Sequence, residues 1–128
     1  KTQPLITTGD LCRCVRAAIT GERPKAADAE VEKAIRRTFQ ALRIAVNDEF
    51  SALDTWLRAL PSCLAPGGRV AVLTFHSGED RRVKKAFEAG LHDGVYAAIA
   101  GEVVRPSSKE VRANPRAAAA KLRWARRP

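Results

Sequence analysis

The chain has 128 residues, of which 45% are hydrophobic and 29% charged, and its net charge is +9. This composition is typical of a folded protein with room for one modest core. No uncharged apolar run reaches about 18 residues and no signal-peptide pattern opens the chain, which argues against a membrane-spanning or secreted protein. Because methionine is absent, we interpret the sequence as a piece of a longer or processed polypeptide.

The N-terminal half of the chain has a helical pattern. Thr7 or Thr8 is a suitable cap for a first helix, which Gly21 and Pro24 would close. A second helix is expected to begin in KAADAEVEKAI and to continue unbroken to about Pro61. Its apolar residues recur at steps of three or four and are expected to pack on a sheet: Phe39, Leu42, Val46, Phe50, Leu53, Leu57 and Leu60.

The pattern changes after the glycine turn at Gly67 and Gly68. Residues 70–75 form a continuous apolar, β-branched run, which predicts a strand buried on both faces in a parallel sheet. A helix should follow at once, with Ser77 as its N-cap and Gly90 past its end. Helix, strand, loop and helix in this order are typical of a layered α/β domain.

Two C-terminal segments are ambiguous. Residues 94–104 suit either a loop or a weak strand. Residues 117–127 are rich in alanine, which favours a helix, but Leu122 and Trp124 alternate with their neighbours in the way of a strand. We favour an edge strand from Lys121 to Arg126 that closes the sheet.

Polar side chains gather directly after the predicted strand: His76, Ser77, Glu79, Asp80 and Arg81. Ligands of open α/β sheets bind outside the carboxyl ends of the strands, so these residues are candidates for substrate binding. His76 could exchange a hydrogen bond with a substrate base. Capping of the following helix is an alternative explanation for the same residues.

Basic residues are concentrated in two places. Arg82, Lys84 and Lys85 follow the strand end, and the region from Arg105 onward carries eight basic side chains against one acidic side chain. A localised basic surface suits a polyanion such as RNA. A solvated basic face is the alternative.

The motifs of several enzyme classes are absent. The sequence has no glycine-rich dinucleotide motif, no P-loop, and neither the HExxH nor the GxSxG pattern. Cys12, Cys14 and Cys63 are too few for a disulfide framework, and they lack the second pair of ligands that a zinc site needs. We therefore expect reduced thiols and no metal site.

Three stretches taken together resemble one family. They are RTFQALRIAVNDEF, PGGRVAVLTFHSGEDRRVKKAF and RPSSKEVRANPRAAAAKLRWARR. In this order they are similar to the C-terminal half of the ribosomal RNA small-subunit (cytosine-N4) methyltransferase family, known as MraW or RsmH. The stretch PLITTGDLCRCVRAAI resembles the end of that family's helical insert. Gly78 departs from the family signature FHSLEDR, and Ala118 and Ala119 stand where a basic residue and a serine are typical.

The resemblance implies an α/β fold, namely the C-terminal part of a class I (Rossmann-like) S-adenosylmethionine-dependent methyltransferase with the end of a helical insert. Residues 1–36 would end the insert, and residues 37–128 would form the C-terminal part of the methyltransferase domain. S-adenosylmethionine would be bound mainly by the N-terminal half, whose cofactor motif has no counterpart here. Methyl transfer to the amine of a cytidine then depends on positioning two ligands.

The resemblance also implies roles for individual residues. His76, Ser77, Glu79, Asp80 and Arg81 would shape the cytidine side of the crevice. RNA phosphates would be held by Arg82, Lys84, Lys85, Arg116, Lys121 and Arg123. Arg43 and Asn47 would meet RNA or lock their helix to the rest of the domain, or else they hydrogen-bond each other or a neighbouring loop. No residue is identified as catalytic.

The implied partners are small-subunit ribosomal RNA, or a precursor of the subunit, and the N-terminal half of the protein. A homodimer and assembly-factor proteins are left open as partners, and no membrane is expected. The implied location is the bacterial cytoplasm or the matrix of a mitochondrion or plastid. The alternative function is that of a cofactor-less homologue with a structural part in ribosome assembly.

Overall fold

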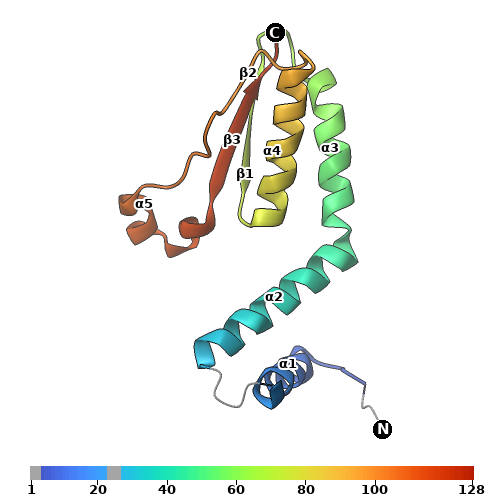
Figure 1. Cartoon of the computed structure of the whole chain (residues 1–128), viewed down its shortest axis with the longest axis vertical. Coiled ribbons are helices and arrows are strands. Elements are labelled where there is room, and N and C mark those ends of the chain that lie inside the picture. Colours follow the sequence, from blue (N-terminus) through green and yellow to red (C-terminus); the bar gives the residue numbers. More distant parts are fainter. Residues whose placement is uncertain (1–3, 23–26) are drawn as a thin grey trace. The chain divides into compact units, whose positions relative to one another are not determined.

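The computed structural model describes residues 4–22 and 27–128. It divides the chain into two units, Lys1–Glu49, which is helical, and Phe50–Pro128, which combines helices with a sheet (Figure 1). The expected end of the helical insert at residue 36 is a separate question from this division and stays a prediction. The expected helix stop at Pro24 lies outside the described residues. None of the helices in the described ranges is long and apolar enough to cross a bilayer.

The first unit contains α1 (Thr8–Glu22) and α2 (Asp28–Asn47). Thr7 caps α1, since its hydroxyl oxygen accepts a hydrogen bond from the Asp10 amide at 3.2 Å. In return the Asp10 carboxylate accepts one from the Thr7 amide at 2.8 Å, and this backbone hydrogen bond holds the pKa of Asp10 below its ordinary value. The two helices pack together and bury Val31 and Ile35 of α2.

The expected continuous helix is broken at Asp48. This residue lies in the left-handed region, with φ 48° and ψ 41°, and its amide donates to the carbonyl of Ile44. Helix α2 therefore ends at Asn47, and α3 (Glu49–Cys63) begins directly afterwards, with Pro61 inside its last turn. Asparagine and aspartate tolerate the left-handed region better than most residues, so the Asn-Asp pair was the signal for this break.

The break divides the predicted apolar stripe into two parts. In α3, Leu57 and Leu60 are buried and Leu53 packs against them, as expected. In α2, Leu42 and Val46 are exposed, and 82% of the Val46 surface is accessible. The prediction that the stripe packs on the sheet is therefore confirmed for α3, and it stays a prediction for α2, which belongs to the first unit.

The second unit continues with β1 (Arg69–Thr74), α4 (Ser77–His92) and β2 (Ala98–Ile99), and then with α5 (Ser108–Ala113), the 3-10 helix η1 (Pro115–Ala119) and β3 (Lys121–Arg126). The strand order is β1-β3-β2, and β3 is antiparallel to both neighbours. The strand predicted over 121–126 is thus confirmed, but it is central in the sheet and not at its edge. The ambiguous segment 94–104 contributes the short β2 and an isolated bridge from Val104 to Leu122.

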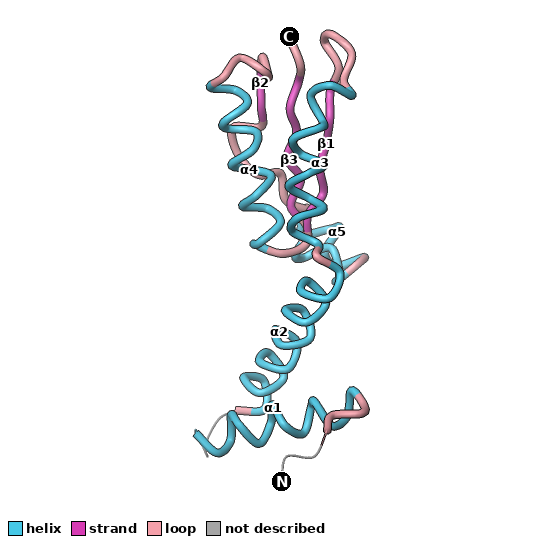
Figure 2. Tube along the Cα trace, turned by 90° about the vertical axis from the view of Figure 1, so that its right-hand side faces the viewer, coloured by secondary structure: helices cyan, strands magenta, loops and turns pink. Residues whose placement is uncertain are grey.

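Helices α3 and α4 lie on one side of the sheet, where Figure 2 shows them beside the strands. Val70 and Val72 of β1 point to these helices, whereas Leu73 and the following Phe75 are each 54% exposed on the other face. The prediction of a strand buried on both faces is therefore wrong within the described residues, because the helices cover only one face. The predicted parallel sheet is also wrong for the described strands, because β1 and β2 each pair antiparallel with β3. β1 and β2 point in the same direction on either side of β3, and α4 lies between them in the chain.

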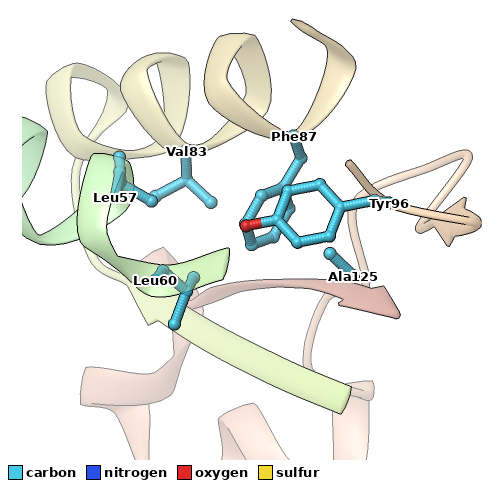
Figure 3. Packing of buried hydrophobic residues seen from close by; sticks show 6 residues of the cluster. All are labelled: Leu57, Leu60, Val83, Phe87, Tyr96 and Ala125. Atoms are coloured by element: carbon cyan, nitrogen blue, oxygen red, sulfur yellow. The ribbon is translucent and has the colours of Figure 1, made fainter. Parts of the chain in front are cut away.

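The core lies between the two helices and the covered face of the sheet (Figure 3). It is built from Leu57, Leu60, Val83, Phe87, Tyr96 and Ala125. Phe87 and Tyr96 meet edge to face, with ring centroids 5.5 Å apart and planes at 74°. Burial raises the pKa of the Tyr96 hydroxyl above its ordinary value. This core fixes α4, and with it the turn that joins α4 to β1.

Candidate functional site

The turn after β1 is held by a reciprocal cap between His76 and Glu79. His76 is the N-cap of α4, and its Nδ1 accepts hydrogen bonds from the amides of Gly78 at 3.2 Å and Glu79 at 3.4 Å. The Glu79 carboxylate accepts one from the Phe75 amide at 3.2 Å. The expected N-cap, Ser77, is instead the first helical residue and is exposed. The capping alternative is thus realised, one residue earlier than expected.

This cap decides which nitrogen of His76 carries the proton. Because Nδ1 accepts two amide hydrogen bonds, the proton of the neutral ring lies on Nε2. Nε2 lies 3.1 Å from the Glu79 carboxylate. The accepting lone pair of His76 is therefore occupied, and the ring serves to cap α4 directly after the end of β1.

Asp80 joins α4 to β3. Its two carboxylate oxygens accept hydrogen bonds from Nε and Nη2 of Arg123, at 2.7 and 3.2 Å, and Lys121 Nζ lies 3.9 Å away. The Asp80 and Arg123 side chains are mostly buried, with 15% and 11% of their surfaces exposed. The hydrogen bonds from Arg123 hold the pKa of Asp80 below its ordinary value, and the charges of Lys121 and Arg105 act in the same direction.

A second cluster lies beside the same turn, around Phe50 at the start of α3. The guanidinium carbon of Arg82 is 4.0 Å from the centre of the Phe50 ring, and Arg82 Nε is 3.5 Å from the carboxylate of Asp54. The Phe50 ring also meets the ring of His76, with ring centroids 5.9 Å apart. A Cβ atom at Gly78 would come within 2.8 Å of the Phe50 ring, so the ring occupies space that position 78 leaves open.

The carboxyl end of β1 opens onto a hollow of about 490 Å³ on the uncovered face of the sheet. Its walls are mainly apolar and include Leu73, Phe75, Val104 and Leu122. Polar side chains at the hollow come from the segment after β2 and from α5 and η1: Arg105, Glu110, Asn114 and Arg116. Asn114 Oδ1 accepts a hydrogen bond from the Arg116 amide at 3.2 Å, which fixes the loop that carries Arg116.

The remaining candidates on α4 differ in their surroundings. Arg81 is exposed in the first turn of α4. Lys84 lies 3.5 Å from Glu88, one helical turn further along. Lys85 is exposed and lines a groove of about 620 Å³ between α3 and α4, together with Arg58 and Arg82. The six predicted phosphate-binding residues are therefore not gathered on one surface.

Arg43 and Asn47 belong to the first unit and bind the same carboxylate. Nε and Nη2 of Arg43 donate to the two oxygens of Glu49 at 2.8 and 3.3 Å, and Asn47 Nδ2 donates to one of them at 3.2 Å. These hydrogen bonds span the break at Asp48. Arg43 and Asn47 therefore bond the side chain of a residue just past the break, and not each other.

Sequence reasoning missed three residues of these clusters: Phe50, Asp54 and Arg105. Phe50 and Asp54 are four residues apart, which places both on one face of α3, but the ring was counted only as part of an apolar stripe. Gly78, where the family signature has leucine, was a usable signal for a large neighbouring side chain. Arg105 was counted only as part of the tail charge.

The topology and the strand-end site together define a class of protein. A helical crossover joins two parallel strands, a third strand returns between them in the opposite direction, and polar side chains lie where the first strand ends. It agrees with the C-terminal part of the class I (Rossmann-like) methyltransferase fold, the fold class that the sequence predicts and that the family match implies. Residues 1–128 match the MraW methylase family, and the chain belongs to it.

Curated relatives of the chain are ribosomal RNA small subunit methyltransferases. Methyltransferase H 2 of Alkaliphilus metalliredigens is 50% identical over 119 residues, which are 93% of this chain and 34% of the relative. Methyltransferase H 1 of Lachnoclostridium phytofermentans is 54% identical over 95 residues, covering 74% and 26%. Methyltransferase H of Rhodopirellula baltica is 44% identical over 124 residues, covering 97% and 36%. The chain thus spans about a third of the length of these relatives.

Proposed function

We propose that the chain forms the C-terminal portion of an rRNA (cytosine-N4) methyltransferase that acts on small-subunit ribosomal RNA. The observation that carries this proposal is the family match over the whole chain. The relatives are bacterial proteins named for small-subunit ribosomal RNA, so the proposed location is the bacterial cytoplasm. The first unit would be the end of the helical insert, and the second unit would be part of the methyltransferase domain.

In this proposal the chain supplies one wall of the cytidine site. The hollow beside Phe75 combines an apolar wall with the polar groups of Asn114 and Arg116. A planar base fits such a surface, because its faces are apolar and its edges need hydrogen bonds. The capped turn at His76 and Glu79 keeps the strand end in place beside the base, while Arg81 lies exposed at the start of α4.

S-adenosylmethionine would supply the methyl group, and the preceding part of the protein would hold most of it. The residues described here would orient the cytosine amine and exclude water from the site. Neither His76 nor Asp80 is suited to take a proton from that amine. The Nδ1 of His76 accepts two amide hydrogen bonds, and Asp80 is held by Arg123 at a lowered pKa.

The phosphate-binding residues of the proposal fall into two groups. Arg82, Lys85 and Arg116 have exposed or half-exposed side chains at grooves and are proposed to meet RNA phosphates directly. Lys84, Lys121 and Arg123 line neither groove and are each close to a carboxylate, so their charge is partly compensated within the protein. Arg82 is also close to a carboxylate, that of Asp54, but it lies at the groove between α3 and α4. We assign Lys121 and Arg123 chiefly to the junction between α4 and β3.

The uncovered face of the sheet is proposed to pack against the rest of the methyltransferase domain. It exposes Leu73, Phe75, Val104 and Trp124, and neighbouring exposed apolar side chains of this kind often mark a contact surface. The relatives are about three times as long as the chain, so such a partner segment would be available in a longer protein that contains it.

Calorimetric titration with S-adenosylmethionine tests the proposal. A longer protein that contains this chain and the family's cofactor region should bind the methyl donor, whereas residues 1–128 alone should bind it weakly or not at all. Absence of binding by the longer protein would favour the alternative of a structural assembly factor.

A further inference from the structure

The Phe50 ring lies at the meeting point of three parts of the second unit. It comes from the start of α3, it touches the cap of α4 through His76, and it lies under the guanidinium of Arg82. The ring lies close to residue 78, where an added Cβ would be 2.8 Å from Phe50 Cζ, so a side chain at that position would require the ring to shift. The position of the Phe50 ring therefore depends on residues at the start of both α3 and α4.

Two groups hold the guanidinium of Arg82: the ring of Phe50 and the carboxylate of Asp54. The guanidinium carbon stands 4.0 Å from the centre of the Phe50 ring, the range in which an arginine stacks on an aromatic face. Nε is buried and faces the carboxylate of Asp54 at 3.5 Å. This is the one ion pair of Arg82 among the residues that the structure describes, and it leaves Nη1 and Nη2 for a ligand.

The surroundings of Arg82 suit a phosphate. Arg58 and Lys85 line the same groove between α3 and α4, and Asp54 and Asp93 are its acidic residues. Asp54 is already engaged with Arg82. A planar guanidinium with two free terminal nitrogens can bind a phosphate through two parallel hydrogen bonds, provided that the plane is fixed.

We propose that Phe50 is a positioning residue: its ring holds the guanidinium of Arg82 flat beside the turn after β1, where Arg82 binds a phosphate of the RNA backbone. The inference rests on the proposed function only in taking RNA as the ligand. It assigns to Phe50 a part in RNA binding in addition to its part in packing.

A double-mutant cycle on RNA affinity tests this inference. The affinity of the protein for a fluorescein-labelled single-stranded RNA of mixed sequence is measured by anisotropy at several KCl concentrations. Arg82→Gln should weaken binding roughly tenfold and reduce the salt slope by about 0.7, the value for one lost contact to a single strand. Phe50→Leu should weaken binding about two- to fivefold, because the stack is lost while apolar burial is kept.

The decisive comparison is Phe50→Leu in the Arg82→Gln background. We expect it to have no further effect on affinity there, because the ring acts through the arginine. Arg82→Lys keeps the charge without the plane and should show the affinity loss without the full change in salt slope.

Controls separate this effect from a general loss of structure. Trp56→Leu removes an exposed aromatic side chain from the same helix and should leave RNA affinity unchanged. Lys33→Gln is the control for the loss of a positive charge as such, since it removes one from the first unit. Thermal unfolding of each variant shows whether the fold is kept. The inference is overturned if Phe50→Leu leaves RNA affinity unchanged, or if its loss is the same with and without Arg82. If the longer protein does not bind the methyl donor, the proposed function is contradicted, but the double-mutant cycle on RNA affinity can still be interpreted.

Discussion

Gly78 and Phe50 show how a single missing side chain shapes the turn after β1. The backbone of Gly78 needs no special conformation, since the only positive φ values among the described glycines are at Gly67 and Gly94. What matters at Gly78 is the missing side chain, because the Phe50 ring and the His76 ring both lie where a Cβ atom would project. The departure from the family signature at this position therefore has a local partner in α3.

Gly78→Ala is expected to destabilise the protein. Alanine in a helix normally gains roughly 0.5–1 kcal/mol over glycine, but here the methyl group would lie 2.8 Å from Phe50 and 3.1 Å from His76 Nδ1. Overpacking of this kind costs about 1–3 kcal/mol, so the net effect should be a loss. Urea unfolding measures it.

The same substitution combined with Phe50→Leu provides the control. The smaller side chain removes the main clash, so the cost of Gly78→Ala should fall by about 1 kcal/mol or more in that background. An equal cost in both backgrounds would show that the two residues are not packed against each other.

The pair of Asp80 and Arg123 predicts a pH dependence of stability. Because the folded pKa of Asp80 is lowered, the pair contributes stability that is fully present above the unfolded pKa of about 3.9 and is lost as pH falls through the folded pKa. Asp80→Asn should lower the free energy of unfolding by about 2 kcal/mol at neutral pH, since it leaves Arg123 mostly buried without its charge partner.

The measurement is urea unfolding of both proteins at a series of pH values down to about pH 3. The difference between the unchanged protein and Asp80→Asn should shrink as the pH falls below the unfolded pKa of aspartate. A constant difference across this range would mean that the pair is not the source of the effect.

At the scale of elements, helix α4 carries both the core and the site. Gly90 lies inside this helix and not past its end, because the helix continues to His92 and the Tyr96 ring packs against the bare Cα of Gly90. The turn at Gly94 then returns the chain so that the Tyr96 amide donates to the carbonyl of Gly90 at 3.0 Å. Gly90 therefore marks the close approach of the Tyr96 ring to α4, and not the end of the helix that the sequence predicts there.

Gly90→Ala is expected to destabilise the second unit by about 1–3 kcal/mol. An added Cβ atom would lie 2.5 Å from the Tyr96 ring, which is fixed against Phe87 in the core. Gly21→Ala is the matched control, because it lies in helix α1 and its methyl group would meet nothing within 4 Å. That variant should be neutral or more stable by up to about 1 kcal/mol. Thermal unfolding followed by circular dichroism distinguishes the two, and equal effects would contradict the packing described here.

Local patterns predicted most of the elements, and long-range partners explain what they missed. The strand over residues 70–75, the helix after it and the C-terminal strand follow from periodicity and turn residues, and the structure contains all three. Periodicity does not say which strand lies in the middle, so β3 was expected at an edge. Nor does it reveal a break that one left-handed residue, Asp48, introduces into a run of helix formers.

The candidate site was predictable in position but not in its pairings. The polar residues after β1 do lie together at the strand end, as the α/β rule requires. The partners of Asp80 and Arg82 could not be found from the sequence, because Arg123 is 43 residues away along the chain and Phe50 comes from another helix. Two of the predicted phosphate ligands, Lys121 and Arg123, share one carboxylate, that of Asp80.

At the scale of the whole molecule, the chain combines a sheet that helices cover on one face with a strongly basic composition. One face of the sheet is covered by α3 and α4, and the other exposes apolar side chains beside the hollow at Phe75. The net charge of +9 favours a polyanionic partner and makes binding dependent on salt. Both features agree with the proposal that the chain forms one wall of an RNA-modifying site.

Mass spectrometry of nucleosides from small-subunit ribosomal RNA tests this account most directly. The RNA is incubated with S-adenosylmethionine and a longer protein that contains this chain, and then digested to nucleosides. We predict N4-methylcytidine at one position, and its loss when the region corresponding to residues 50–128 is deleted although the methyl donor is still bound. Methylation that persists without this region would contradict the account, as would methyl-donor binding with no modified cytidine in the presence of the complete protein.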